Sequence, residues 1–329
     1  MKKKKQQRSR RYNHVYQRKR RHRIRQMWCV GISVAFIVII LLVGWLAFTK
    51  HKRAEKEVAN VVMDSKKADE KKESKESTTT QKETETVTDE KTLYQFLKTS
   101  LEPVGSTMYI WGGGWNKEDT GAGEDARRIG VNPQWKIFYE QQDASYDFNN
   151  YRYAHGNGLD CSGYVGWVIY NLFETEDGKA GYVDKASKMA QNFANLGFGT
   201  YIYQSDLNVH KPGDICSSTC GDCGHIFIVL GQCEDGSVVL VHSSPPGVKI
   251  SGTPAADGTK ESKAATLAAK YMKAYYPDWY ARYPDCTTDI SYLSHYSCMR
   301  FSVSKGSVVS DPEGIQNMSA EEVLKMLFK

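Results

Sequence analysis

An uncharged stretch of twenty-two residues, Trp28 to Thr49, constrains this chain more than any other feature. A helix that crosses a bilayer needs about 20 predominantly apolar residues. Trp28 and Trp45 lie near the ends of the stretch, where interfacial aromatic side chains belong. The stretch is long for a cleaved secretion signal, and no clear A-x-A-like cleavage site follows it. We therefore expect residues 28–49 to form an uncleaved, single-pass transmembrane helix, a signal-anchor.

The positive charge of the chain belongs to the segment before this stretch. Residues 1–27 contain thirteen Lys and Arg and no acidic residue, so removing them from the formal net charge of +6 leaves −7 for the remainder. The more positive flank of a membrane helix stays in the cytoplasm. This predicts a cytoplasmic N-terminus and an extracellular C-terminal part. Because orientation explains the basic tail, we expect no nucleic-acid partner.

Residues 50–91 have the composition of a flexible tether. They contain eleven basic and eleven acidic residues and no aromatic residue. Such a segment cannot bury enough apolar surface to offset the entropy lost on ordering. We expect a disordered, charged linker with an end-to-end distance of roughly 35 Å, which lets the following domain act away from the bilayer.

The folded domain is expected at residues 92–303, with a tail at 304–329. Apolar spacing predicts helices at 93–101 and 186–196. The segment of about forty residues before Gly158 is long for a loop, so we expect it to carry a helix around 133–142 or to fold over the site. Strand patterns follow at 226–230, 238–242, 248–250 and 299–303, and Glu234-Asp235-Gly236 reads as a hairpin turn. Because helices precede strands, the pattern predicts an α+β fold with an antiparallel sheet. A capping box that begins at Ser319 predicts a short helix in the tail.

The domain is organised around a short stretch that contains Cys161. Residues 158–163 read Gly-Leu-Asp-Cys-Ser-Gly and lead into an apolar run, which predicts a tight turn and a central, buried helix. The unpaired N–H groups at a helix start carry partial positive charge, which favours thiolate over thiol. Cys161 is therefore a candidate nucleophile. The alternative is a packed core thiol, since free cysteine is among the most buried residue types.

Two histidines are spaced as a cysteine nucleophile would require. Such a nucleophile needs a base that accepts its proton and a group that orients the base. His225 begins one predicted strand and His242 ends the next, so a hairpin would set them side by side at one edge of the sheet. That edge could face the helix start that carries Cys161, as in papain-like hydrolysis. The alternatives are a strand-edge role for His225 and a turn role for His242.

Four segments, in this order, resemble the NlpC-type cell-wall peptidases, which are papain-like cysteine enzymes. The segments are Tyr109-Ile110-Trp111-Gly112-Gly113, Asp160-Cys161-Ser162-Gly163, Lys211-Pro212-Gly213-Asp214, and Gly224-His225 with its strand, followed by His242-Ser243-Ser244 and Gly247-Val248. The similarity spans residues 95–303. It implies an NlpC-type fold in which an N-terminal helical part carries the cysteine and an antiparallel sheet carries both histidines.

The resemblance also implies roles for individual residues. It makes Cys161 the nucleophile, His225 the general base and acid, and His242 the group that orients His225. The implied reaction is acylation of Cys161 followed by hydrolysis by water, with no cofactor and no metal.

Four further residues are implied to bind substrate. Tyr109 would line the cleft by the oxyanion site, in the same aromatic-Gly-Gly segment as Trp111. Asp160 and Ser162 would contact the free amine or amide of the peptide. The implied substrate is the bacterial cell-wall stem peptide, typically cut beside γ-linked D-glutamate.

Two long segments depart from the compact form of the family. Residues 115–157 separate the aromatic-Gly-Gly segment from the cysteine motif, and residues 252–284 interrupt the strands with an Ala- and Tyr-rich helix. Both inserts could reshape specificity. Tyr164 is a smaller departure, because the family often has Phe or Leu there.

The remaining cysteines leave a choice between disulfides and zinc. Cys29 lies in the uncharged stretch, and six others are Cys216, Cys220, Cys223, Cys233, Cys286 and Cys298. An extracellular location permits disulfides. The spacing Cys-x3-Cys-x2-Cys before His225 is not a common zinc pattern, so disulfides are favoured over metal.

These observations predict a membrane-anchored extracellular cysteine peptidase that hydrolyses peptidoglycan stem peptides. Its partners would be that substrate and the bacterial plasma membrane, with a wall-remodelling or secretion complex as a further candidate. The alternatives are a papain-like amidase or acyltransferase on another substrate, and a catalytically silent wall-binding scaffold.

Overall fold

The computed structural model describes residues 91–174, 176, 178–219 and 224–329. The expected basic tail, the transmembrane helix and all but the last residue of the linker lie outside these residues. None of the helices within them has the length and apolar character that crossing a bilayer requires.

A mixed sheet of eight strands forms the centre of the described part of the chain. The strand order is β2-β1-β7-β6-β5-β4-β8-β3. All neighbouring pairs are antiparallel except β1 and β2, which are parallel. The strands are β1 (Met108–Tyr109), β2 (Gly158–Leu159), β3 (Gly199–Ile202), β4 (Ile215–Ser218), β5 (Ile226–Gln232), β6 (Val238–Ser244), β7 (Gly247–Gly252) and β8 (Tyr296–Phe301).

The predicted α+β class is confirmed, but the predicted all-antiparallel sheet is wrong at one edge. The strands that carry the two histidines, β5 and β6, are antiparallel as expected. The parallel pair β1–β2 comes from the helical half of the sequence and joins the sheet through β7. Each of these strands has two residues. The segment 108–111 allowed a short strand or a turn, but its parallel pairing with β2 depends on tertiary contacts that no local pattern contains.

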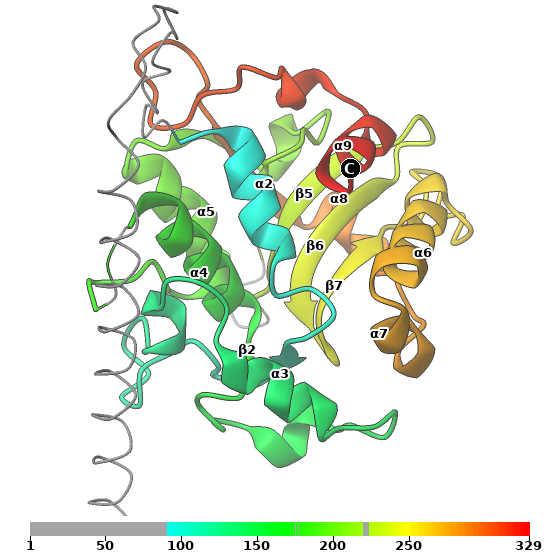
Figure 1. Ribbon diagram of the computed structural model, residues 1–329. Coiled ribbons are helices and arrows are strands. Elements are labelled where there is room, and N and C mark those ends of the chain that lie inside the picture. Colours follow the sequence, from blue (N-terminus) through cyan, green and yellow to red (C-terminus); the bar gives the residue numbers. More distant parts are fainter. Residues whose placement is uncertain (1–90, 175, 177, 220–223) are drawn as a thin grey trace, which may run out of the picture. The chain divides into compact units, whose positions relative to one another are not determined.

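The helices group on defined sides of the sheet. Figure 1 shows α2, α4 and α5 together on one face, with α6 and α7 beyond β7. The α-helices are α2 (Leu93–Leu101), α3 (Pro133–Glu140), α4 (Cys161–Phe173), α5 (Ala186–Asn195), α6 (Lys263–Tyr275), α7 (Pro277–Arg282), α8 (Ser291–Ser294) and α9 (Ala320–Leu327). Short 3₁₀ helices occur at η1 (Asp125–Arg127), η2 (Phe148–Tyr151), η3 (Gln204–Asp206) and η4 (Ile315–Asn317).

Helix α4 is the central helix that its sequence predicts. Every residue from Cys161 to Tyr170 is buried, because apolar side chains cover nearly its whole circumference. On β5, Ile226, Ile228 and Leu230 belong to the same core as α4. Phe227 and Val229 belong to a second, smaller cluster. Alternation along the strand thus gives the sheet two apolar faces.

The second cluster contains a disulfide between Cys216 of β4 and Cys298 of β8. The two residues are direct partners in the β4–β8 register. This confirms the preference for a disulfide at these two positions. In the described residues Cys161, Cys233 and Cys286 are free thiols; Cys29, Cys220 and Cys223 lie outside them.

The two ends of the described segment meet. Ser310 donates its N–H to the carbonyl of Lys91 at 2.9 Å and accepts the N–H of Leu93 at 2.8 Å. Near the C-terminus α9 begins with the predicted capping box at Ser319 and buries its apolar face. Lys98 of α2 donates to the carbonyl of Leu327 at 2.6 Å. Residues after 303 therefore pack on the same core as α2.

Candidate active site

Backbone contact determines where α4 begins and therefore where Cys161 lies. Cys161 is the first residue of α4 and Asp160 is its N-cap. The Asp160 carboxylate accepts the N–H of Gly163 at 2.7 Å, which satisfies one of the free N–H groups of the first turn. A Cβ at Gly163 would lie 2.1 Å from the carbonyl oxygen of Gly113. The first turn of α4 can approach the Gly112–Gly114 loop this closely only because residue 163 has no side chain.

A network of hydrogen bonds holds Asp160 and Ser162 beside the nucleophile. Ser162 Oγ donates to Asp160 Oδ1 at 2.8 Å, and the N–H of Gly112 donates to Oδ2 at 3.1 Å. Trp115 Nε1 donates to Ser162 Oγ at 2.9 Å. Burial raises the pKa of Asp160 to about 6, although these hydrogen bonds act against the rise. The carboxylate is consequently charged at neutral pH and close to its titration range.

Cys161 opens into a cleft of about 290 Å³. The cleft brings together five of the residues that the sequence predicted: Tyr109, Trp111, Asp160, Cys161 and Ser162. Tyr109 is buried, whereas Trp111 is 42% exposed and stacks beneath the Arg152 guanidinium at 4.6 Å. Gly224, the residue before His225, lines the same cleft. The substrate-binding residues proposed from sequence therefore share one cavity wall with the nucleophile.

The Cys161 thiol faces the backbone on both sides of His225. Its Sγ lies 3.9 Å from the carbonyl oxygen of Gly224. Burial raises the pKa of the thiol above its usual range, and the Asp160 carboxylate adds to the rise. The N–H groups of Ile226, Ser162 and Cys161 lower that pKa, but less strongly. The helix start thus acts in the expected direction, yet burial outweighs it and Cys161 rests as a thiol.

His225 and His242 form a hydrogen-bonded pair across the β5–β6 hairpin. His225 Nε2 lies 3.1 Å from His242 Nδ1, and His242 Nε2 lies 3.1 Å from Ser251 Oγ. Protons on both Nε2 atoms satisfy this chain, since a neutral imidazole donates from one nitrogen and accepts at the other. That tautomer leaves His225 Nδ1 with its lone pair available to a thiol proton. Ser251 is a third member that sequence reasoning missed.

Both imidazoles are neutral at physiological pH. Burial lowers the pKa of His225 to about 4. Burial also lowers the pKa of His242 well below its usual range, and positive charge at His225 or Lys249 acts in the same direction. A neutral imidazole can accept a proton from a neutral thiol, so the pair suits concerted proton transfer better than a preformed ion pair.

Tyr292 covers the histidine pair and was not predicted. Its ring centroid lies 5.4 Å from that of His225 and 5.9 Å from that of His242. Burial raises the pKa of the Tyr292 phenol, and the charges of Tyr296 and Cys161 add to the rise, so the phenol lies within electrostatic reach of the nucleophile. Tyr292 comes from α8, shortly after the second insert, where no sequence motif distinguishes it from the other tyrosines.

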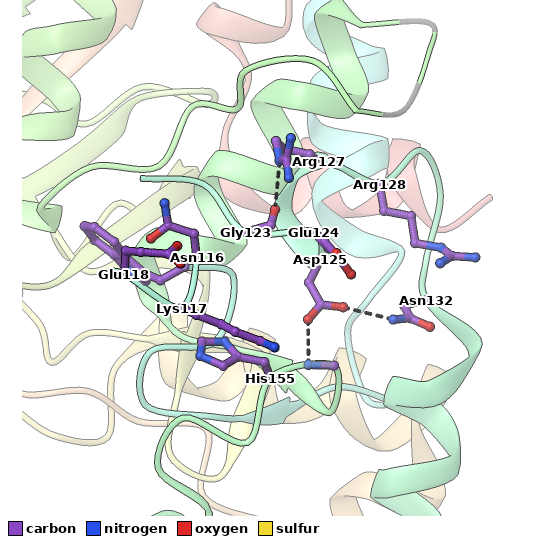
Figure 2. A pocket seen from close by; sticks show the side chains of 12 residues that line it. Asn116, Lys117, Glu118, Gly123, Glu124, Asp125, Arg127, Arg128, Asn132 and His155 are labelled. Atoms are coloured by element: carbon purple, nitrogen blue, oxygen red, sulfur yellow. Dashed lines mark hydrogen bonds between the residues drawn. The ribbon is translucent and has the colours of Figure 1, made fainter. Parts of the chain in front are cut away.

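The first insert builds a second pocket next to the cleft. This pocket has a volume of about 560 Å³, and Trp115 lines both cavities. Asp125 organises its wall by accepting from Asn132 at 2.9 Å, from Gly156 at 2.8 Å and from Trp135 at 3.1 Å. Figure 2 shows Asp125 between Asn132 and the loop that carries His155. The insert therefore adds polar volume beside the cleft.

Comparisons with known proteins give no match for this chain: no known protein family, no curated protein and no solved structure matches it.

Proposed function

We propose that this protein is a cysteine peptidase of the NlpC type, anchored in the bacterial plasma membrane, which hydrolyses peptidoglycan stem peptides outside the cell. One observation carries the proposal. A cysteine at the start of a buried helix faces the backbone around His225, whose imidazole is hydrogen-bonded to His242 at 3.1 Å. Nucleophile, base and orienting group are the three parts that thiol-dependent acyl transfer needs.

In the proposed reaction the Cys161 thiol transfers its proton to Nδ1 of His225 as the sulfur attacks the peptide carbonyl carbon. The C–N bond breaks, and the amine leaves with the proton that His225 carried. Water, deprotonated by the same imidazole, then hydrolyses the thioester and restores the thiol. His242 stabilises the imidazolium by accepting from its Nε2–H, and Ser251 accepts from His242 in turn.

The cleft walls suit a peptide that has a free amine close to the cleaved bond. Asp160 supplies a buried carboxylate beside Cys161, and Ser162 supplies a hydroxyl that Trp115 holds in place. A carboxylate with a pKa of about 6 is charged at neutral pH and favours an ammonium partner. Tyr109 and Trp111 provide aromatic walls. These features support the amine end of a stem peptide as the bound group.

Membrane anchoring and cell-wall location belong to the same proposal. They rest on the uncharged stretch at 28–49, on the basic residues before it and on the disulfide between Cys216 and Cys298. Disulfides persist in oxidising compartments such as the outside of the cell. A wall-remodelling or secretion complex would be the setting in which such an enzyme acts.

The test is mass spectrometry of fragments released from purified peptidoglycan by the full-length chain in detergent. We expect cleavage within stem peptides, and Cys161→Ala should reduce the rate by at least about 10³-fold. Cys286→Ala is the matched control, because it removes a buried free thiol that does not line the cleft. Unchanged hydrolysis by Cys161→Ala would refute the peptidase. Turnover of other amides or esters without stem-peptide cleavage would favour an amidase or acyltransferase.

A further inference from the structure

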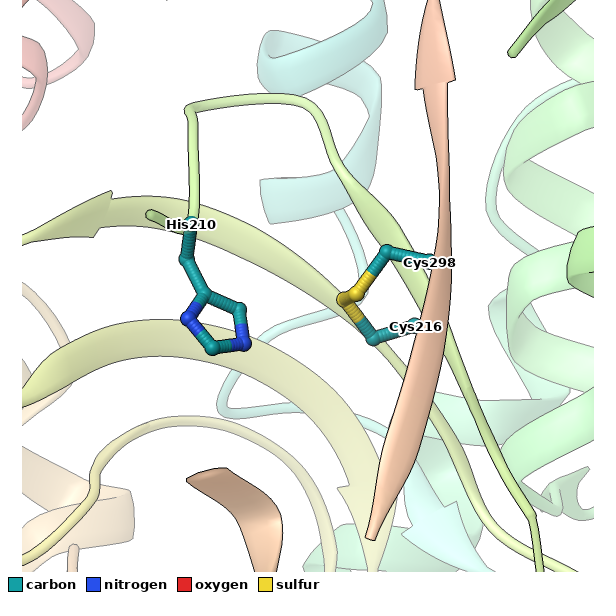
Figure 3. Close-up of side chains that lie close together, drawn as sticks. All are labelled: His210, Cys216 and Cys298. Atoms are coloured by element: carbon teal, nitrogen blue, oxygen red, sulfur yellow. A yellow bond between two sulfur atoms is a disulfide. The ribbon is translucent and has the colours of Figure 1, made fainter. Parts of the chain in front are cut away.

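A second cluster of reactive side chains lies apart from the cleft, on the other apolar face of the sheet. It consists of His210, Cys216 and Cys298, with exposed fractions of 7%, 0% and 0%. The atoms that could bind a metal, one from each residue, all lie within 4.8 Å of one another. Figure 3 shows the imidazole of His210 turned toward the two sulfur atoms. The three residues therefore converge on one buried point.

His210 has an unsatisfied atom at this point. Its Nε2 is buried and has no hydrogen-bond partner among the residues that the structure describes. Buried polar side-chain atoms usually have a partner, and an exception calls for a physical explanation such as a bound ion. The backbone N–H of His210 donates to Gln232 Oε1 at 2.8 Å, which holds the residue in place. A neutral imidazole keeps a lone pair on one ring nitrogen, which can bind a metal ion.

We propose that His210, Cys216 and Cys298 bind one zinc ion when the two cysteines are reduced, and that the disulfide is the alternative, metal-free state of the same site. Two thiolates and one imidazole are a ligand set that zinc accepts, with water as the fourth ligand. Zinc would also give His210 Nε2 the partner that it lacks. The zinc proposal does not rest on the proposed peptidase function, because none of the three residues lines the cleft.

Electrons and protons balance when the site changes between its disulfide state and its zinc-bound state. A dithiol reductant gives two electrons and two protons to the Cys216–Cys298 disulfide and itself becomes a disulfide. Zn²⁺ then displaces both thiol protons, while His210 binds through its lone pair. In the reverse direction the two thiolates give two electrons to an incoming disulfide such as oxidised glutathione. The zinc ion and two thiolates of the oxidant are released.

Cobalt is the spectroscopic probe for this site. The full-length chain is reduced, freed of metal and titrated anaerobically with Co²⁺, which is then displaced by Zn²⁺. We expect about one equivalent with sulfur-to-cobalt charge-transfer bands, as a thiolate-rich tetrahedral site requires. His210→Ala, Cys216→Ser and Cys298→Ser should each weaken binding by at least about 100-fold, since losing a ligand costs more than losing a group that orients one.

Matched controls separate this cluster from the other metal-binding side chains. His295→Ala removes an exposed histidine close to Cys298 in sequence, and Cys233→Ser removes a free thiol; both should bind Co²⁺ as the parent does. The double variant Cys220→Ser/Cys223→Ser should also retain the bands. Absence of binding by the reduced chain overturns the proposal. Cobalt binding that persists in Cys298→Ser would also overturn it. Cobalt binding that is lost in Cys220→Ser/Cys223→Ser would do the same.

A further measurement needs no variant and so does not depend on whether His210→Ala folds. Oxidised glutathione is added to the zinc-loaded parent chain, and released zinc and free thiols are counted together. We expect about one zinc for every two thiols lost, with the Cys216–Cys298 disulfide recovered in the peptide map. Zinc that stays bound after this disulfide has formed would refute the proposal.

Discussion

The imidazoles of His225 and His242 meet at nearly a right angle, with an interplanar angle of 79° and 3.1 Å between Nε2 and Nδ1. His242 can therefore accept the Nε2–H of His225 and fix its tautomer. We predict that His242→Ala lowers kcat for stem-peptide hydrolysis by about 10²-fold or more, the usual range for losing acid–base support.

Ser251→Ala tests the outer end of the same chain. It removes the partner of His242 Nε2 but leaves the His225–His242 contact intact, so we expect a smaller loss, on the order of 10-fold, with little change in KM. Steady-state kinetics on purified stem peptides check both variants. Equal losses of kcat in His242→Ala and Ser251→Ala would contradict the prediction that His242 matters more than Ser251.

The high pKa of the Cys161 thiol predicts slow alkylation near neutral pH. Burial and Asp160 both favour the thiol, so labelling by iodoacetamide should rise steeply only above the usual range of a cysteine. Asp160→Asn keeps a helix-capping side chain and removes the negative charge, so it should accelerate labelling. Peptide mass spectrometry between about pH 6 and pH 10 follows Cys161 alone. Fast labelling at pH 6 would show a stabilised thiolate instead.

Gly163→Ala should be strongly destabilising. Its Cβ would lie 2.1 Å from the Gly113 carbonyl oxygen, so either α4 or the Gly112–Gly114 loop must shift. We expect a loss of about 2–3 kcal/mol in the free energy of unfolding, typical of overpacking, together with loss of activity. The matched control is Gly121→Ala, where the nearest atom would be 4.0 Å away. Denaturant titration should place this control within about 0.5 kcal/mol of the parent chain.

Buried histidines make the folded state sensitive to acid. The pKa of His210 falls from its ordinary value of 6.5 to about 4 in the folded chain. Between these values the unfolded chain binds the proton and the folded chain does not, so stability falls as pH drops from about 6.5 to about 4. Asp160 acts in the opposite direction, because its folded pKa is raised to about 6.

Two variants separate these opposing contributions. His210→Gln should flatten the fall in stability toward acid, and Asp160→Asn should make it steeper. Urea unfolding midpoints measured across this pH range provide the test. A His295→Ala control, which changes an exposed histidine, should follow the parent chain. A His210→Gln curve parallel to that of the parent would show that His210 is not buried neutral.

The elements that follow a strong local pattern could be predicted from the sequence. Helix α2 has the predicted bounds, and α4 is buried as its apolar circumference requires. The pairing of Cys216 with Cys298 could not be predicted, because it depends on β4 and β8 being neighbours across 82 residues of chain. The order of strands in a sheet depends on the whole fold, so the spacing of cysteines along the sequence cannot predict it.

The residues of the candidate site also fall into two groups: those that a local sequence pattern indicates and those that only tertiary contacts bring to the site. Cys161 begins a buried helix, as the turn and helix signals of its own segment predict. Tyr292 and Ser251 reach the histidines only through tertiary contacts, and neither stands in a motif. Trp115 belongs to the first insert and stands in no motif. Its hydrogen bond to Ser162, which joins this insert to the site, is a tertiary contact that the sequence does not reveal.

The clamp that Ser310 forms on the chain at Lys91 and Leu93 has a mechanical consequence. Any pull exerted through the preceding segment reaches the folded body at these two backbone hydrogen bonds. The load would then pass to the segment around Ser310 and to the start of α2, while β5 and β6 lie elsewhere in the order of the sheet. In the membrane-anchored enzyme that we propose, tension from the cell wall would load Ser310 and the start of α2 rather than the contact between His225 and His242.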